Sequence, residues 1–260
     1  MVKVPKTFYA QAKSWMTKNQ SHGSHAFLRF VMLVFVERLS QVSEDFIFKG
    51  GNLLWVYIKT PRPTIDVDFA TKSLDSDGEV LRVLESACGL VDSSITFQIK
   101  SFRPVGQDGA TGAAVSVLYK TAEGQENSFD LDIVYAVPTL TRQLPSSINH
   151  DVLVTVATME NIVADKLDAS RRFMGGNTRM KDFDDLWRIS RLSPSLVDWV
   201  VLSQVLMERN IAPVLDHSWL NAQMLRRWAS HRNRSKGLPE ELAITFNEIN
   251  AWLNDGLGNE

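Results

Sequence analysis

Hydrophobic and polar residues alternate strictly along residues 65–69, and residues 129–135 repeat the arrangement with Asp130 and Asp132 on one face. In the first segment the even positions are Asp66 and Asp68, and the odd positions are apolar. Successive side chains of a β-strand point to opposite faces, so each segment predicts a strand with one apolar face and one acidic face. We therefore expect Ile65 to face the core with the other apolar positions, and the aspartates to share the opposite face.

The remaining pattern mixes helices and strands up to about residue 150, and only helices follow from residue 158 onward. This predicts an α+β (mixed α/β) fold in two parts: residues 1–150 as an α/β lobe with N-terminal helices, and residues 151–260 as a helical lobe that closes the cleft. The expected helices of the first part cover residues 5–20, 25–40, 52–58 and 78–90, and its further strands cover residues 46–48, 94–102 and 113–119.

Composition excludes several classes of protein. The chain has 260 residues, 44% of them hydrophobic and 22% charged, which is typical of a globular protein. Its formal net charge of −2 argues against a protein that binds polyanions over its whole surface. The single cysteine, Cys88, predicts a reducing compartment. Residues 27–39 are too short an apolar stretch to span a bilayer, and the N-terminus does not resemble a signal peptide, so we expect a cytoplasmic protein.

A glycine pair precedes the first acidic strand. Gly50 and Gly51 follow a short predicted strand and open a helix, where backbone N–H groups can approach a phosphate closely. Asp66 and Asp68 repel each other on one strand face unless a cation lies between them, and Mg²⁺ often binds one or two carboxylates together with substrate phosphates. Without a ligand, the same residues form a tight turn and a solvated acidic face.

The second acidic strand contains Asp130 and Asp132. If it lies beside the first strand, it brings a third carboxylate to the metal site, as two-metal phosphoryl chemistry requires. That carboxylate can also act as the base for an attacking hydroxyl group. Asp132 is preferred because it lies nearer the C-terminal end of the strand, and a solvated strand face is the alternative.

Two later helices carry further charged residues. Lys166 borders an apolar stripe, so its stem is expected to be half buried while its ammonium balances phosphate charge or lies at the surface. Asp182 and Asp185 are three residues apart, on one flank of their helix, where they can orient Lys166 or a metal. Asp184 is expected to form a surface ion pair with Arg188.

These segments together resemble the nucleotidyltransferase superfamily, and more narrowly the AbiEii family of abortive-infection and type IV toxin–antitoxin toxins. The resemblance covers about residues 44–190 and depends on the order of four segments. Their sequences are Phe48-Lys49-Gly50-Gly51-Asn52-Leu53-Leu54, Arg62 with Asp66-Val67-Asp68-Phe69, Glu160-Asn161-Ile162-Val163-Ala164-Asp165-Lys166-Leu167, and Arg179-Met180-Lys181-Asp182-Phe183-Asp184-Asp185-Leu186.

The resemblance implies transfer of a nucleoside monophosphate from an NTP to an acceptor, with tRNA as the expected acceptor and a cognate antitoxin as partner. It implies Mg²⁺ or Mn²⁺ at Asp66, Asp68 and Asp132, with Lys166, Asp182 and Asp185 completing the catalytic set. The residues expected to bind the nucleotide are Lys49, Gly50, Gly51, Asn52, Arg62 and Lys166. Asn52 departs from the family, which usually has threonine or serine there, and Arg62 is alternatively a tether for its loop.

One basic run lies near the C-terminus. It contains Arg226, Arg227, Arg232, Arg234 and Lys236, which can bind an RNA backbone or form a solvated helix face. His22 and His25 have no metal-binding partners nearby in the sequence. A nucleotide-binding regulatory protein without transfer activity is the alternative function, which the acidic residues argue against.

Overall fold

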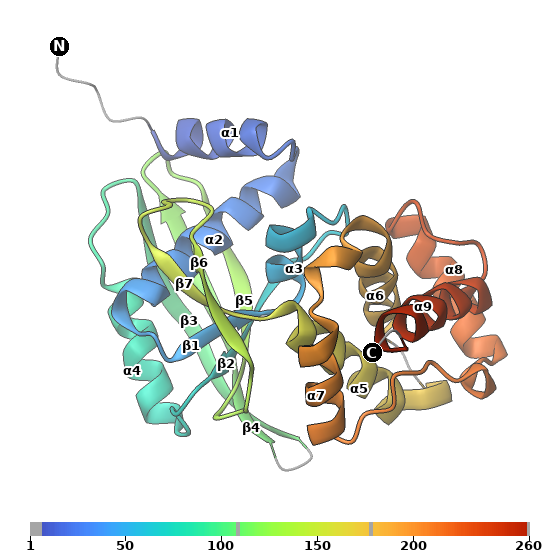
Figure 1. The fold of residues 1–260 in the computed structure, drawn as a ribbon. Coiled ribbons are helices and arrows are strands. Elements are labelled where there is room, and N and C mark those ends of the chain that lie inside the picture. Colours follow the sequence, from blue (N-terminus) through green and yellow to red (C-terminus); the bar gives the residue numbers. More distant parts are fainter. Residues whose placement is uncertain (1–6, 108–109, 177–178, 259–260) are drawn as a thin grey trace. The chain divides into compact units, whose positions relative to one another are not determined.

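The structure is a computed structural model that describes residues 7–107, 110–176 and 179–258 (Figure 1). Its chain forms two compact units, one of residues 1–53 and 64–157 and one of residues 54–63 and 158–260. We expected the helical part to begin at residue 151; the helical unit also includes the loop before the first acidic strand. The predicted mixed α/β fold class is confirmed.

The first unit contains a sheet of seven strands in the described residues, in the order β3-β4-β5-β2-β1-β7-β6. β2 and β5 are parallel neighbours, and β1 runs antiparallel to β2. The strands are β1 (Phe46–Lys49), β2 (Asp66–Thr71), β3 (Ile95–Gln107), β4 (Ala110–Thr121), β5 (Glu126–Val134), β6 (Thr141–Pro145) and β7 (Leu153–Ala157).

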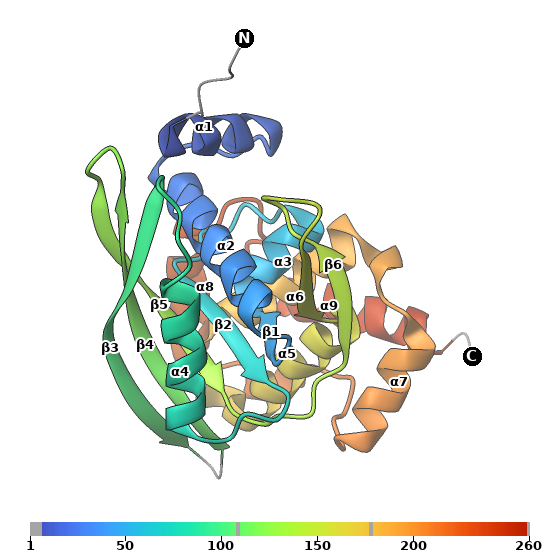
Figure 2. The same ribbon diagram turned by 90° about the vertical axis from the view of Figure 1, so that its left-hand side faces the viewer.

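Three helices, α1 (Phe8–Lys18), α2 (Ser24–Val42) and α4 (Asp77–Cys88), belong to this unit, and Figure 2 shows α2 and α4 over the sheet. α2 packs on β1, β7 and α4 because most of its circumference is apolar. Its Phe35 contacts Phe97 of β3 and Phe129 of β5, with ring centroids 5.2 Å and 5.6 Å apart. These contacts bury the apolar face of the sheet and leave the aspartate positions on the other face.

The structure corrects two sequence-based expectations in this unit. Ile65 is 60% exposed, because β2 begins only at Asp66 and the alternation is not yet part of a strand at residue 65. β6 and β7 were not expected at all. β7 pairs in parallel with β1 and antiparallel with β6, so both strands extend the sheet beyond the predicted set.

The second unit is helical in its described residues. It contains α5 (Met159–Phe173), α6 (Met180–Leu192), α7 (Trp199–Glu208), α8 (Ala222–Arg234) and α9 (Leu242–Leu257), together with most of α3 (Gly50–Ile58). α6 packs against α5, α8 and α9, and Phe183 meets Phe246 at a centroid distance of 4.9 Å. As expected, Thr158 caps α5: its hydroxyl accepts a hydrogen bond from the Asn161 N–H.

Among the helices formed by the described residues, we find none with the length and apolar content that crossing a membrane requires.

Candidate active site

Four carboxylates line one face of two adjacent strands in the first unit. Asp66 and Asp68 lie on β2, and the strand register places them directly beside Asp130 and Asp132 of β5, respectively. Neighbouring strands are about 4.8 Å apart, so each pair of carboxylates is close. The intervening Val67 is fully buried, which fixes the four aspartates on the opposite face. Register therefore places Asp130 beside β2 as closely as Asp132, and the sequence-based preference for Asp132 gains no support from it.

The glycine turn reaches this acidic face at Asp68. Lys49, the last residue of β1, is the register partner of Asp68, and Gly50 follows with a φ angle of +73°. A Cβ atom on Gly50 would lie only 1.7 Å from Asp68 Oδ2 and 2.7 Å from Asp68 Cβ. Rotating the carboxylate alone cannot relieve that overlap. The absence of a side chain at residue 50 is therefore what lets the first turn of α3 approach Asp68.

We expect Gly50→Ala to lower the free energy of unfolding by about 2 to 4 kcal/mol, because it combines a strained backbone angle with the overlap at Asp68. Chemical denaturation of both proteins measures this difference. Gly78→Ala is the matched control, since Gly78 lies in α4 with open space around its Cβ position. Equal stabilities of the Gly50 and Gly78 variants would contradict the close approach of α3 to Asp68.

The side chain of Asn52, which was expected to offer its amide to a phosphate, is buried and hydrogen-bonded within the protein. Only 1% of the residue is exposed. Its Oδ1 accepts a hydrogen bond from Arg29 Nε at 3.0 Å, and its Nδ2 donates to the backbone carbonyl of Asp66 at 2.6 Å. Buried polar groups need such partners, and here the partners use both ends of the amide. The Asn52 side chain therefore fixes the start of β2, and phosphate contact at this residue is left to the backbone.

Arg29 is a residue that the sequence analysis did not assign to the site. It lies on α2, is 5% exposed and hydrogen-bonds to Asn52. An arginine within a largely apolar helix predicts a polar partner inside the protein, because a buried guanidinium requires one. What the sequence does not give is the identity of that partner, 23 positions away.

A buried ionic cluster lies in the helical unit. Asp185 of α6 is fully buried and accepts two hydrogen bonds from Arg62, at 2.8 Å from Nε and 3.0 Å from Nη2. The same carboxylate lies 2.5 Å from Lys166 Nζ of α5. Asp182 contacts the Lys166 ammonium at 3.3 Å and Arg179 at 2.8 Å. Arg62 is thus tethered to α6, as one of the two sequence-based alternatives stated, and Lys166 is more deeply buried than expected.

Neighbouring charges determine the protonation states of Asp185 and Lys166 in this ionic cluster. Burial alone would raise the pKa of Asp185, but the adjacent Lys166 and Arg62 outweigh it, and the pKa lies below its ordinary value. Burial alone would lower the pKa of Lys166, but Asp185 and Asp182 outweigh it, and the pKa is raised. Both groups are therefore charged at neutral pH. Three cations face two carboxylates, so this set carries a net charge of +1.

Asp184 pairs with Arg188 as predicted, but the pair is buried instead of lying at the surface. Asp184 is fully buried, and its other oxygen contacts His231 Nε2 at 2.8 Å and the Ser235 hydroxyl at 2.5 Å. The i,i+4 spacing predicts the partner but not the packing of α8 over both residues. Asp184 therefore stabilises the contact between α6 and α8.

The basic run lies on α8 and just beyond it. Arg226, Arg234 and Lys236 are exposed, whereas Arg227 and Arg232 are half-buried. Between them, Trp228 is packed in the core of the helical unit. The run therefore lies on a largely exposed helix that is anchored by Met224 and Trp228, which leaves both sequence-based alternatives open.

Asp66 and Asp68 are the residues that could bind a divalent metal ion. Among the residues that the structure describes, no group of three or more His, Cys, Asp or Glu side chains is arranged to hold a metal ion. A magnesium ion does not require such a group, because it commonly binds one or two carboxylates and takes other ligands from substrate phosphates and water. The paired carboxylates beside the glycine turn fit a metal ion that binds together with a nucleotide.

Two solved structures with the same fold come from Helicobacter pylori. The chain matches a Helicobacter pylori protein provisionally described as a nucleotidyltransferase, with 16% identity, 89% of this chain and 94% of the other covered, and a TM-score of 0.53. It also matches Helicobacter pylori JHP933, with 18% identity, coverage of 92% and 94%, and a TM-score of 0.53. At these identities the likeness shows the fold alone. A comparison with curated protein sequences gave no match.

The sequence itself matches a family model over residues 34–248, well over half of the chain. That model describes the nucleotidyl transferase AbiEii toxin of type IV toxin–antitoxin systems. The matched range includes the glycine turn, the two acidic strands and the Lys166–Asp185 cluster. The chain therefore belongs to the AbiEii family of nucleotidyltransferase toxins.

Proposed function

We propose that the protein transfers a nucleoside monophosphate from an NTP to an RNA acceptor, in a reaction that requires a divalent cation. The observation that carries the proposal is the register of β2 and β5, which aligns Asp66 with Asp130 and Asp68 with Asp132 beside the Gly50 turn. Family membership supports the reaction class and a cognate antitoxin. The resemblance noted from the sequence favours tRNA as the acceptor, and both substrates place the reaction in the cytoplasm.

In this reaction a hydroxyl oxygen of the acceptor forms a bond to the α-phosphorus of the NTP. The bond between that phosphorus and the oxygen bridging to the β-phosphate breaks, and pyrophosphate leaves. The hydroxyl proton moves to a carboxylate on β5, for which Asp132 and Asp130 are the candidates. Asp66 and Asp68 would hold the divalent ion, which supplies positive charge for the developing charge on the phosphate oxygens.

Lys166 has a second role in the proposal, as a cation for the triphosphate. An ammonium group has three protons, and Asp182 and Asp185 account for two of them. The two carboxylates hold the ammonium group in one position. Its remaining proton is suited to a phosphate oxygen. Lys49 and the backbone at Gly50, Gly51 and Asn52 are also proposed to contact the nucleotide.

The test is a labelling experiment with purified protein, total RNA and each of the four α-labelled NTPs in turn. With Mg²⁺ or Mn²⁺ present, we expect label in RNA from at least one NTP, and none after chelation. Fractionating the RNA then identifies the acceptor. NTP binding without label in any RNA would contradict the proposal and favour a regulatory nucleotide-binding protein.

The basic run yields a separate prediction about the acceptor. If Arg226, Arg234 and Lys236 contact RNA phosphates, their replacement by glutamine should weaken RNA binding. Each lost phosphate contact should lower the log–log salt slope by about 0.7 to 0.9, depending on whether the RNA is single- or double-stranded. Affinity measured across a salt series gives the slope, and the affinity for NTP should be unchanged.

A variant with the same change in net charge controls for non-specific attraction. Lys72, Lys100 and Arg103 are exposed residues of the first unit, and all three are replaced by glutamine. We expect the control to keep the wild-type salt slope. The same slope in both variants would make the basic run a solvated helix face.

A further inference from the structure

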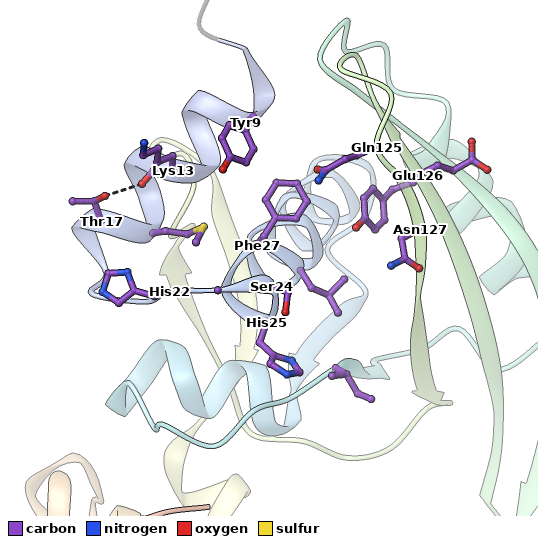
Figure 3. A pocket seen from close by; sticks show the side chains of 15 residues that line it. Tyr9, Lys13, Thr17, His22, Ser24, His25, Phe27, Gln125, Glu126 and Asn127 are labelled. Carbon is purple, nitrogen blue, oxygen red and sulfur yellow. Dashed lines mark hydrogen bonds between the residues drawn. The ribbon is translucent and has the colours of Figure 1, made fainter. Parts of the chain in front are cut away.

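A pocket of about 720 Å³ lies in the first unit, apart from the acidic face. It is bordered by α1, the start of α2, the β4–β5 hairpin and the residue before β2 (Figure 3). Its volume is within the range of roughly 300 to 1,000 Å³ that is usual for small-ligand sites. Nothing in the proposed function so far uses it.

One wall of this pocket carries nitrogen hydrogen-bond donors. Lys13 of α1, His22 and His25 line it, and all three side chains are exposed. None of the three takes part in an ion pair with another residue that the structure describes. α2 also begins here, with Gly23 at its N-cap and no side-chain cap. The Lys13 ammonium and the imidazole N–H groups can donate hydrogen bonds to phosphate oxygens. Glu126 also lines the pocket, and its carboxylate lies 3.8 Å from Lys120 Nζ.

The other walls suit a nucleobase. Tyr9 and Phe27 present aromatic rings whose centroids are 6.3 Å apart, and Tyr9 is 57% exposed. Across the pocket, the hairpin contributes the amides of Gln125 and Asn127, which can pair with the edges of a base (Figure 3). Aromatic stacking with hydrogen bonds to base edges is how proteins bind unstacked, single-stranded RNA.

The position of the pocket indicates which substrate it serves. Ile65 lines it, and the next residue is Asp66, so the pocket ends where the acidic strand begins. Ile65 directly precedes Asp66, so an RNA strand that leaves the pocket past Ile65 reaches the start of β2, where the carboxylates begin. The glycine turn approaches β2 at Asp68 instead. Donor phosphates at the turn and an acceptor entering past Ile65 would reach the carboxylates from different sides.

A second path links the pocket to the same point. His25 lies one helical turn before Arg29, which hydrogen-bonds to Asn52, and Asn52 holds the carbonyl of Asp66. The helix that carries His25 therefore also carries the arginine that holds Asn52 against the start of β2. The pocket and the acidic strand belong to the same compact unit.

We propose that this pocket holds the single-stranded 3′-terminal nucleotides of the RNA acceptor. Bases stack against Tyr9 and Phe27, and phosphates lie toward Lys13 and His25. The 3′ end then leads past Ile65 to the carboxylates. This inference rests on the proposed function, because it assumes an RNA acceptor, but its direct readout is RNA binding and needs no transfer.

The experiment uses a 5′-fluorescent, eight-nucleotide single-stranded RNA with a free 3′ hydroxyl group and measures its anisotropy with the full-length protein. We expect Tyr9→Ala to raise the Kd about tenfold, within the range found when a stacking side chain is removed. Lys13→Ala should lower the salt slope by about 0.7. Both residues are exposed, so the variants should remain folded. NTP binding should be unchanged in each.

Lys18→Ala is the matched control, because Lys18 is an exposed lysine of the same helix that does not line the pocket. Wild-type RNA affinity in the Tyr9 and Lys13 variants, or an equal loss in the Lys18 variant, would overturn the inference. So would loss of binding to the cognate antitoxin with RNA binding intact, which would make the pocket a protein interface. If the wild type transfers label to RNA while the pocket variants transfer with unchanged RNA KM, this inference fails and the proposed function stands.

Discussion

Asp68→Asn is expected to abolish nucleotidyl transfer while the protein remains folded, and Asp66→Asn should do the same. Asparagine keeps the shape of the side chain and removes the charge that would hold a divalent ion. Losing that electrostatic contribution should reduce turnover at least a thousandfold, or about 4 kcal/mol of transition-state stabilisation. Stability should change little, because asparagine keeps the size of the aspartate side chain and one of its acceptor oxygens.

Transfer rate and thermal stability are measured together for these variants. Asp151→Asn is the matched control, since Asp151 is an exposed aspartate of the same unit outside the strands. Asp130→Asn and Asp132→Asn then decide which β5 carboxylate takes the proton, because only the base should show a large loss of turnover. If activity in the Asp68 and Asp66 variants follows the folded fraction, these aspartates are structural.

Lys166→Ala should reduce turnover about a hundredfold or more without unfolding the protein. The ammonium is proposed to meet triphosphate charge that grows in the transition state, where such a contact contributes several kcal/mol. Asp185 keeps its two hydrogen bonds from Arg62 in this variant, so the buried carboxylate is still paired. Single-turnover kinetics at saturating NTP measure the loss. Near-normal transfer would make Lys166 a purely structural residue.

In contrast to Lys166→Ala, Asp185→Ala is expected to lower mainly the stability of the protein. It leaves Arg62 without its carboxylate and Lys166 with only Asp182. Removing one partner of a buried ion pair typically costs about 3 to 5 kcal/mol, since a charge remains buried without compensation. Glu126→Ala is the control, because it breaks an ion pair with Lys120 whose side chains are both more than half exposed. It should cost about 1 kcal/mol or less.

The pKa shifts set the pH range of this effect. The pKa of Asp185 is lower in the folded protein, so its contribution is present above its unfolded pKa of about 3.9 and is lost as pH falls through the folded value. The pKa of Lys166 is raised, so its contribution is lost only as pH rises through a value above about 10.4. The stability difference between wild type and Asp185→Ala should be constant from about pH 4 to 10 and should shrink below pH 4. A difference that shrinks near pH 7 would contradict the assigned charges.

Local patterns in the sequence were enough to predict the two acidic strands. Alternation in residues 129–135 corresponds to β5, and that in residues 65–69 corresponds to β2 apart from its first residue. Ile65 lies outside β2 because the chain pairs only from Asp66, and pairing depends on a neighbour that alternation cannot identify. β7 was missed because its last four residues are all buried, and so short a run has no periodicity to detect. β6 is an edge strand with mostly polar, exposed residues.

The sequence could not predict the role of a residue whose partner lies far away along the chain. The amide of Asn52 is a plausible phosphate ligand until α2 places Arg29 against it. Asp184 reads as a surface residue until α8 covers it. In contrast, Asp182 and Asp185 were placed beside Lys166 from helical spacing and family resemblance, and the structure has both contacts. Local spacing predicts which groups share a face, and tertiary packing decides what that face contacts.

The central claim is that the α-phosphate of an NTP moves to the acceptor. The most direct measurement compares the same NTP labelled at the α- or the γ-phosphate, incubated with protein, divalent cation and acceptor RNA. The account predicts α-label in RNA and γ-label in released pyrophosphate, with neither product formed by Asp68→Asn. Label from the γ-phosphate in the RNA would show phosphoryl transfer, and no label in RNA from either would show no transfer; both results would contradict the account.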